Sequence, residues 1–155
     1  MYQFGTKSEK ELNGVRDDLV RTTRRTLTLS PIDFAVFDGL RTDAEQAEYV
    51  RTGVSKTMNS KHLIQPDGFG HAVDLVPYIN GKLRWELRPC ILIAEAMHEA
   101  ATELAVPLIW GAIWDTPFLE LDRADLENEV ERYKERRRAR GKKAFIDAPH
   151  FQTIT

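Results

Sequence analysis

The feature that most constrains this chain is a carboxylate inside an apolar run. Asp74 is the third residue of Ala72-Val73-Asp74-Leu75-Val76, a segment that otherwise has the composition of a buried β-strand. A buried charge is costly unless another group pairs with it, and a metal ion would pair with it well. Two histidines, His62 and His71, precede Asp74 within residues 60–74. We therefore expect Asp74 to belong to a metal site.

A further carboxylate and histidine occur in a second apolar run, Phe145-Ile146-Asp147-Ala148-Pro149-His150-Phe151. A hydrolytic zinc site uses three protein ligands and leaves one position open. His62, Asp74 and His150 would supply two imidazoles and one carboxylate. Asp147 is then the candidate general base for a water activated by the metal. The spacing of these residues is a weak pattern by itself.

Arg41 stands where a predicted strand ends and a predicted helix begins, a common place for functional side chains. It could stabilise the oxyanion that forms when water adds to a peptide carbonyl. A surface arginine at a helix start explains the position equally well.

The remaining histidines have weaker claims. His71 is a rival ligand, but an odd spacing on a strand would put it on the opposite face from Asp74, so we favour a polar neighbour. His98-Glu99 begins like the helical H-E-x-x-H zinc motif, but Thr102 replaces the second histidine. The single Cys90 excludes an intrachain disulfide and a cysteine-rich zinc site.

Length and composition indicate one domain. The 155 residues are 42% hydrophobic and 30% charged, which is ordinary for a globular protein that buries a core. A net charge of −2 gives no general attraction to nucleic acid or anionic membranes. We find no signal peptide and no stretch long enough to span a membrane.

Hydrophobic periodicity predicts both helices and strands. The expected helices cover about 8–28, 44–53 with Ala44, Ala47 and Val50 facing inward, and a long segment from Pro89 with a stripe of Cys90, Ile93, Ala94, Met97, Ala101 and Leu104. The expected strands are 32–37, 73–78, 83–85 after an Asn80-Gly81 hairpin turn, 108–110 and 144–153.

Residues 116–143 are unusually charged, with an acidic first half and a basic second half from Arg132 to Lys143. Leu126, Val130 and Tyr133 keep helical spacing, so we expect an exposed helix laid over the domain. A solvated face is the usual explanation for such charges. Contact with an anionic envelope polymer is the second, and nucleic acid is not expected because aromatic stacking residues are lacking.

Several short motifs, in this order along the chain, resemble the zinc peptidases that cut peptidoglycan stem peptides, and the phage endolysin branch above all. They are Phe4-Gly5-x-x-Ser8-Glu9-Lys10-x-Leu12, Leu29-Ser30-Pro31-x-Asp33-Phe34, Gly39-Leu40-Arg41-Thr42, Ser60-Lys61-His62, Gly70-x-Ala72-Val73-Asp74, Pro77-Tyr78-Ile79-Asn80-Gly81-Lys82, Gly111-Ala112-x-Trp114 and Asp147-x-x-His150. The family includes L-alanyl-D-glutamate endopeptidases and D-alanyl-D-alanine carboxypeptidases and dipeptidases. The resemblance covers residues 1–115 and 144–152.

The resemblance implies a small single-domain α+β fold, Hedgehog/D-Ala-D-Ala-peptidase-like, with a central antiparallel sheet flanked by helices. It places His62, Asp74 and His150 as ligands of one zinc ion, Asp147 as the catalytic base and Arg41 at the substrate carbonyl. Ser60 and Gln46 fall near the substrate cleft, as the resemblance implies. Two departures are a longer gap between His62 and Gly70 and a charged helical insertion at about 116–143.

The resemblance also implies a monomeric endolysin that hydrolyses the L-alanyl-D-glutamate bond of the stem peptide during host-cell lysis. Such a protein would stay in the host cytoplasm until a holin releases it to the cell wall. The alternatives are a bacterial D-alanyl-D-alanine carboxypeptidase or dipeptidase, and a non-catalytic module that binds the envelope or nucleic acid.

Overall fold

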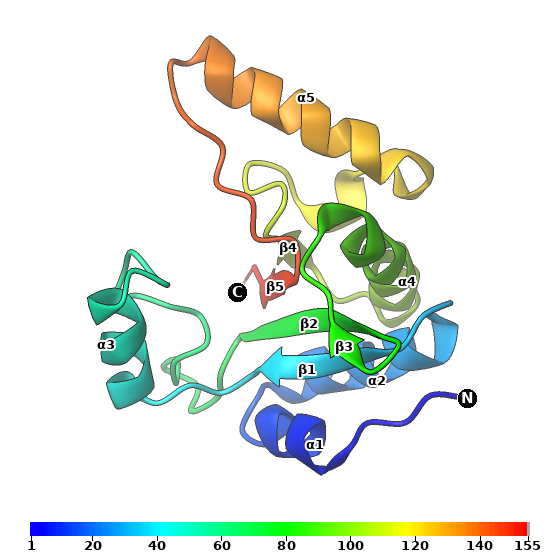
Figure 1. The fold of residues 1–155 in the computed structure, drawn as a ribbon, viewed down its shortest axis with the longest axis vertical. Coiled ribbons are helices and arrows are strands. Elements are labelled where there is room, and N and C mark those ends of the chain that lie inside the picture. The colour runs from blue at the N-terminus through cyan, green and yellow to red at the C-terminus, as the bar shows by residue number, and fades with distance from the viewer. Residues whose placement is uncertain (155) are drawn as a thin grey trace.

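The computed structural model describes residues 1–154, which form one small α+β fold around an antiparallel sheet (Figure 1). This fold class is the one that the sequence predicts. In chain order the elements are α1 (Thr6–Leu12), α2 (Asp17–Leu29), β1 (Phe34–Asp38), α3 (Asp43–Arg51), β2 (Ala72–Ile79), β3 (Lys82–Leu83), α4 (Leu87–Leu104), β4 (Leu108–Trp110), the short 3-10 helices η1 (Phe118–Glu120) and η2 (Arg123–Asp125), α5 (Leu126–Ala139) and β5 (His150–Thr153).

The sheet has the strand order β1-β2-β5-β4, with β3 paired to the far end of β2. All of these pairings are antiparallel. The register sets Asp74 of β2 opposite His150 of β5 on one side and opposite Asp38 of β1 on the other. Directly paired residues on neighbouring strands point to the same face. The register therefore brings three polar side chains into one row on one face.

The opposite face of the sheet carries the hydrophobic core. Val73 and Leu75 of β2 are fully buried there, in one cluster with residues of α1, α2 and α4. The apolar stripe of α4 is buried as predicted, except that Leu104 at its end is partly exposed. Helix α3 stands apart from this layer, beyond the end of β1 (Figure 1).

The predicted helix over 8–28 is two helices, because the chain breaks between α1 and α2. Gly14 has a φ of +90°, a left-handed conformation that favours glycine. Its carbonyl accepts a hydrogen bond of 2.9 Å from the amide of Gly70, and Gly70 in turn accepts one of 2.9 Å from Arg16. The break thus docks the N-terminal helices onto the loop that precedes β2.

The predicted inward face of α3 is wrong. Gln46 is its fully buried residue, whereas Ala44, Ala47 and Val50 are exposed. This helix packs over a buried polar network instead of an apolar surface, so a polar side chain faces inward. A capping box formed by Thr42 and Glu45 begins this helix.

The two strands predicted at 83–85 and 144–153 are shorter than expected. Strand β3 ends at Leu83, and β5 begins only at His150. Residues 140–149, which we call the arm, run from α5 down to β5 without regular structure. The arm is tied to the loop after β4, because the amide of Asp147 donates to the carbonyl of Gly111 at 2.8 Å.

The charged segment 116–143 contains the predicted helix, which packs on the domain through one face and exposes most of its charged residues. Only Leu126–Ala139 is α-helical. Leu126, Val130 and Tyr133 are buried as predicted, and they belong to the same hydrophobic cluster as Phe118 of η1. None of the helices within residues 1–154 is both long and apolar enough to cross a membrane.

Candidate metal centre and active site

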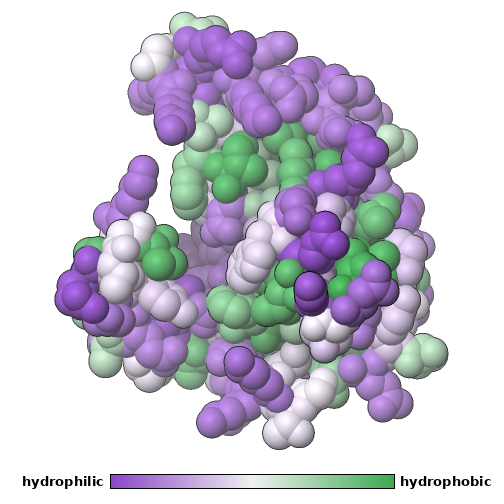
Figure 2. All heavy atoms as spheres, viewed as in Figure 1, coloured by the Kyte–Doolittle hydropathy of each residue, from purple (hydrophilic) through white to green (hydrophobic). Residues whose placement is uncertain are grey.

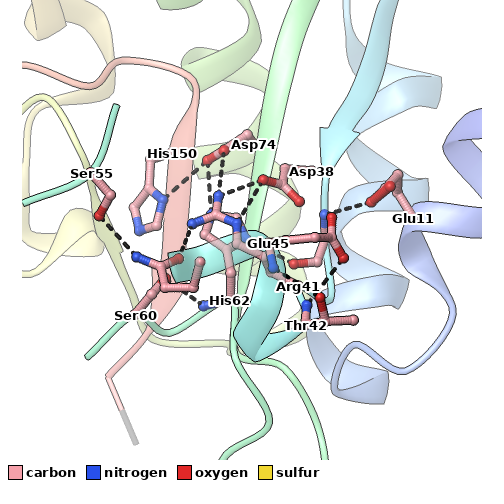
Figure 3. A network of polar contacts seen from close by, with 12 residues as sticks. Glu11, Asp38, Arg41, Thr42, Glu45, Ser55, Ser60, His62, Asp74 and His150 are labelled. Atoms are coloured by element: carbon pink, nitrogen blue, oxygen red, sulfur yellow. Dashed lines mark hydrogen bonds and ion pairs between the residues drawn. The ribbon is translucent and has the colours of Figure 1, made fainter. Parts of the chain in front are cut away.

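Three side chains converge on the open face of the sheet, and they are the three predicted ligands (Figure 3). Asp74 Oδ1 lies 3.2 Å from His62 Nε2 and 3.1 Å from His150 Nδ1. One ligand atom from each residue lies within 4.8 Å of the other two. Both imidazoles are buried, and the carboxylate is nearly so. The cluster therefore has the size and donor types of a metal site.

His62 reaches the sheet from the loop between α3 and β2. Its carbonyl accepts a hydrogen bond of 2.8 Å from the amide of Arg41. The hydroxyl of Ser60 accepts one of 3.1 Å from the amide of His62. Both contacts fix the loop backbone, whereas Asp74 and His150 are fixed by the pairing of β2 with β5.

The outer nitrogens of both imidazoles also have partners. His62 Nδ1 lies 2.8 Å from the carbonyl oxygen of Gly39, which only accepts hydrogen bonds, so this nitrogen carries a proton. His150 Nε2 lies 2.9 Å from Oε1 of Gln152. In the neutral rings, the inner nitrogens then present lone pairs toward the carboxylate of Asp74. Three acceptors facing one another need a cation or a proton between them.

Electrostatics within the cluster agree with this need for positive charge. Burial disfavours the charged form of Asp74, but the positive charge of His62 and hydrogen bonds from both imidazoles outweigh it and hold the pKa of Asp74 below its usual range. Burial likewise opposes a charge on His150, but Asp74 raises the pKa of His150 above its usual value. The cluster thus stabilises a positive charge beside Asp74.

Asp147, the predicted general base, lies on the arm close to these residues. Burial raises the pKa of its carboxyl group, and the carboxylate of Asp74 raises it further. The arm reaches this position because residue 111 is a glycine. A Cβ atom there would lie 2.2 Å from the carbonyl oxygen of Asp147.

Arg41 is a buried residue, so the alternative of a surface arginine is wrong. Its guanidinium donates to the carboxylate of Asp38 through Nε at 3.0 Å and also through Nη2. Nη1 donates to Oε1 of Gln46 at 2.5 Å, and Nη2 lies 3.9 Å from Asp74 Oδ2. The guanidinium also lies 4.5 Å from the ring centroid of Tyr49. Arg41 is thereby held beside the cluster of His62, Asp74 and His150 (Figure 3).

No sequence motif marks Asp38 as a functional residue. It follows a β-bulge at the end of β1, and such bulges often re-aim side chains next to active sites. Burial raises the pKa of Asp38, while His62 and Arg41 oppose that rise. The only sequence signal was a second acidic residue at the end of an apolar strand.

Gln46 lies within the network rather than in an open cleft. Its amide nitrogen donates to Ser55 Oγ at 2.9 Å and to the carbonyl of Thr57 at 2.5 Å. The side chain is fully buried and links Arg41 to the loop after α3. Ser60 is partly buried, with its hydroxyl directed at the backbone of His62.

His71 points away from the cluster. Its Nε2 lies 2.7 Å from Asp67 Oδ2, so it stands beside the loop turn and not beside Asp74. His98 lies on α4, with its ring centroid 5.1 Å from that of Phe118.

Comparisons with known proteins identify the family of this chain. Residues 1–154 match the family described as phage L-alanyl-D-glutamate peptidase. The L-alanyl-D-glutamate peptidase of Escherichia phage T5 is 36% identical over 135 residues, which cover 84% of this chain and 90% of that protein. The crystal structure of the Serratia marcescens L-Ala D-Glu endopeptidase ChiX superposes with a TM-score of 0.69 at 33% identity, over 98% of this chain and 90% of that one.

Proposed function

The chain belongs to the phage L-alanyl-D-glutamate peptidase family, and from this premise we propose that it is a zinc-dependent peptidoglycan endopeptidase that lyses the host cell. Its substrate is the stem peptide, and the bond it hydrolyses joins L-alanine to D-glutamate. The products are a new carboxylate on L-alanine and a free amino group on D-glutamate.

The observation that carries the zinc assignment is the convergence of three lone pairs at His62, Asp74 and His150. Two imidazoles and one carboxylate are a common ligand set of catalytic zinc, which keeps one position open. A zinc ion held there would supply Lewis acidity that polarises the peptide carbonyl and activates water. Gly39 and Gln152 hold the outer nitrogens of the two rings and so orient them.

The chain's own residues would move the protons and stabilise the charge. Asp147 takes a proton from the attacking water and delivers it to the departing amine of D-glutamate. Its raised pKa brings it closer to the range in which a carboxyl group both accepts and donates. Arg41 stabilises the negative charge that develops on the carbonyl oxygen.

The protein acts as a monomer that accumulates in the host cytoplasm and reaches the cell wall through a holin. A D-alanyl-D-alanine carboxypeptidase of the same fold is the second candidate, because the same zinc chemistry would serve either bond.

One experiment tests the zinc and the bond together. Purified protein is analysed for metal, and peptidoglycan digested with it is analysed by mass spectrometry. We expect about one zinc per chain, fragments ending in L-alanine and fragments starting with D-glutamate. Release of free D-alanine would support the carboxypeptidase instead. Full activity in a metal-free preparation would exclude the zinc mechanism.

A further inference from the structure

Two aromatic side chains lie exposed on the same face of the sheet as the metal cluster. Phe37 of β1 is 39% exposed and Trp85, just after β3, is 53% exposed. Their ring centroids are 5.0 Å apart and the rings meet edge to face at 87°. We call this pair the aromatic wall. Exposed aromatic rings that lie together form an apolar patch, and such patches can mark a binding site.

The strand register places the two rings of the aromatic wall on either side of Val76. Tyr78 pairs with Leu83, and the amide of Arg84 donates to the carbonyl of Pro77 at 2.8 Å, so Trp85 follows at the level of Val76. On the other side of β2, Val76 pairs with Ala35 of β1, two residues before Phe37. Val76 is fully buried, yet it lies outside the main hydrophobic cluster. The register places the two rings over Val76 on this face.

The wall therefore adjoins the metal cluster. Val76 and Asp74 are two residues apart on β2, so their side chains share a face and lie about 7 Å apart along the strand. Phe37 is the residue directly before Asp38, which holds Arg41. In Figure 2 this face is hollowed between the α3 side and the rest of the molecule, and pale and green side chains border the hollow.

The two sides of the scissile bond differ in charge. On the amine side, D-glutamate and the residues after it carry carboxylates. On the acyl side, L-alanine is joined through a lactyl group to N-acetylmuramic acid, and this part has methyl groups and a sugar ring but no charge. Aromatic rings bind methyl groups and the apolar faces of sugars through burial of apolar surface.

The charges that flank Trp85 cancel, which suits the uncharged acyl side of the substrate. Arg84 and Glu86, which flank Trp85, form an ion pair at 3.1 Å and leave no net charge there. We propose that Phe37 and Trp85 form the subsite for the muramyl-L-alanine side of the substrate and give the enzyme a preference for glycan-linked stems. This inference rests on the proposed function and fixes the direction in which the stem lies across the sheet.

The test compares two substrates that both carry an uncharged amide on L-alanine and differ in the group that forms it. One is N-acetylmuramyl-L-alanyl-γ-D-glutamyl-diaminopimelate and the other is the same tripeptide with an N-acetyl group in place of the muramyl group. We expect the wild type to have a kcat/KM at least about tenfold higher on the muramyl substrate, because one buried sugar face contributes over about 1.4 kcal/mol. Phe37→Ala and Trp85→Ala should remove most of this preference, and the loss should appear as a higher KM for the muramyl substrate. The kcat/KM on the tripeptide that lacks the muramyl group should change by less than about twofold.

Two further variants distinguish a loss of substrate binding from a loss of folding. Trp85→Leu keeps Val76 covered but has no ring face, so it should retain Tm and still lose the preference. Tyr2→Ala removes another exposed aromatic ring, at the N-terminal end of the chain, whose hydroxyl donates to the carbonyl of Pro31. This variant should leave kcat/KM unchanged for both substrates. Calorimetric titration with N-acetylmuramyl-L-alanine amide, which has no cleavable bond, should show binding to the wild type and a loss in Trp85→Ala.

The outcomes separate this inference from the proposed function. If the wild type cleaves both substrates equally, or if Phe37→Ala and Trp85→Ala keep its preference, the subsite assignment is wrong while the peptidase stands. If both substrates lose activity equally in Trp85→Leu, the wall is only structural. If the wild type cleaves neither substrate, the proposed function itself fails.

Discussion

The two faces of strand β2 are stabilised by different interactions, hydrophobic packing on one and polar contacts on the other. On one face, Val73 and Leu75 pack into the hydrophobic cluster beneath α2 and α4 and need only shape and volume. On the other face, Asp74 lies between two imidazoles and near Arg41, and every polar group depends on a partner. A change on the first face should therefore alter stability, and a change on the second should alter metal binding and catalysis.

The largest effect is expected from removing a ligand on the polar face. His62→Ala should abolish both zinc binding and activity, because only one imidazole and one carboxylate remain. His71→Ala is the matched control, since His71 contacts Asp67 and not the cluster. Zinc content by elemental analysis and release of new amino groups from peptidoglycan measure the two variants. If His71→Ala loses zinc while His62→Ala keeps it, the ligand assignment is wrong.

The next effect concerns Asp147. Asp147→Asn should keep the zinc and the Tm but lower the rate by about 10²–10⁴-fold, because the amide is nearly isosteric and does not accept the proton of water at neutral pH. Zinc content, Tm and rate are measured on the same preparation. Loss of zinc would show that Asp147 is a ligand, and a lower Tm with an unchanged rate per folded molecule would show that it is structural.

A variant on the core face should behave in the opposite way. Leu75→Ala leaves a cavity in the cluster and should lower the free energy of unfolding by about 2–5 kcal/mol. The zinc content and rate of the folded fraction should stay near those of the wild type. Ile64→Ala, at an exposed loop position, should change stability by less than about 0.5 kcal/mol. A large loss of rate in folded Leu75→Ala would show that the two faces are coupled.

The smallest effect is expected at a positively charged surface pocket outside both faces. Lys134, Arg138, Lys142 and Lys143 surround a surface pocket between α5 and the arm. Charge reversal by Arg138→Glu with Lys142→Glu should weaken action on whole envelopes a few-fold at low salt and leave a soluble muropeptide unaffected, because salt screens such attraction. Lys7→Glu with Lys10→Glu, on exposed positions of α1, is the control. Equal losses on both substrates would place the pocket in the active site.

The sequence predicted best those features that depend on nearby residues. Asn80 and Gly81 turn the hairpin with φ values of 51° and 76°, as their residue types favour. The stripe of α4 repeats at helical spacing and is buried accordingly. Asp74 stood out because a charge in an apolar strand needs a partner.

Features that depend on distant contacts were not predictable in the same way. The break after α1 depends on Gly70, which lies 56 residues beyond Gly14 in the sequence and bonds to it. Asp38 and Gln152 contact residues close to them in the sequence, Arg41 and His150. These contacts become part of the site only because the strand pairing brings Asp38 and His150 beside Asp74. The side of α3 that faces inward is set by the guanidinium of Arg41, which bonds to Gln46. The apolar residues of α3 therefore predicted the wrong face.

The position of β5 has a consequence for how the enzyme is made. This strand comes after all the others in the chain, yet it lies between β2 and β4 in the sheet. A ribosome therefore releases His150 only after the rest of the sheet has emerged, and the gap for β5 must stay open until then. Catalytic competence should arise in one late step of folding, because a nascent chain that ends before residue 150 lacks both His150 and an inner strand of the sheet. Truncated translation products should therefore have no activity on the cell wall.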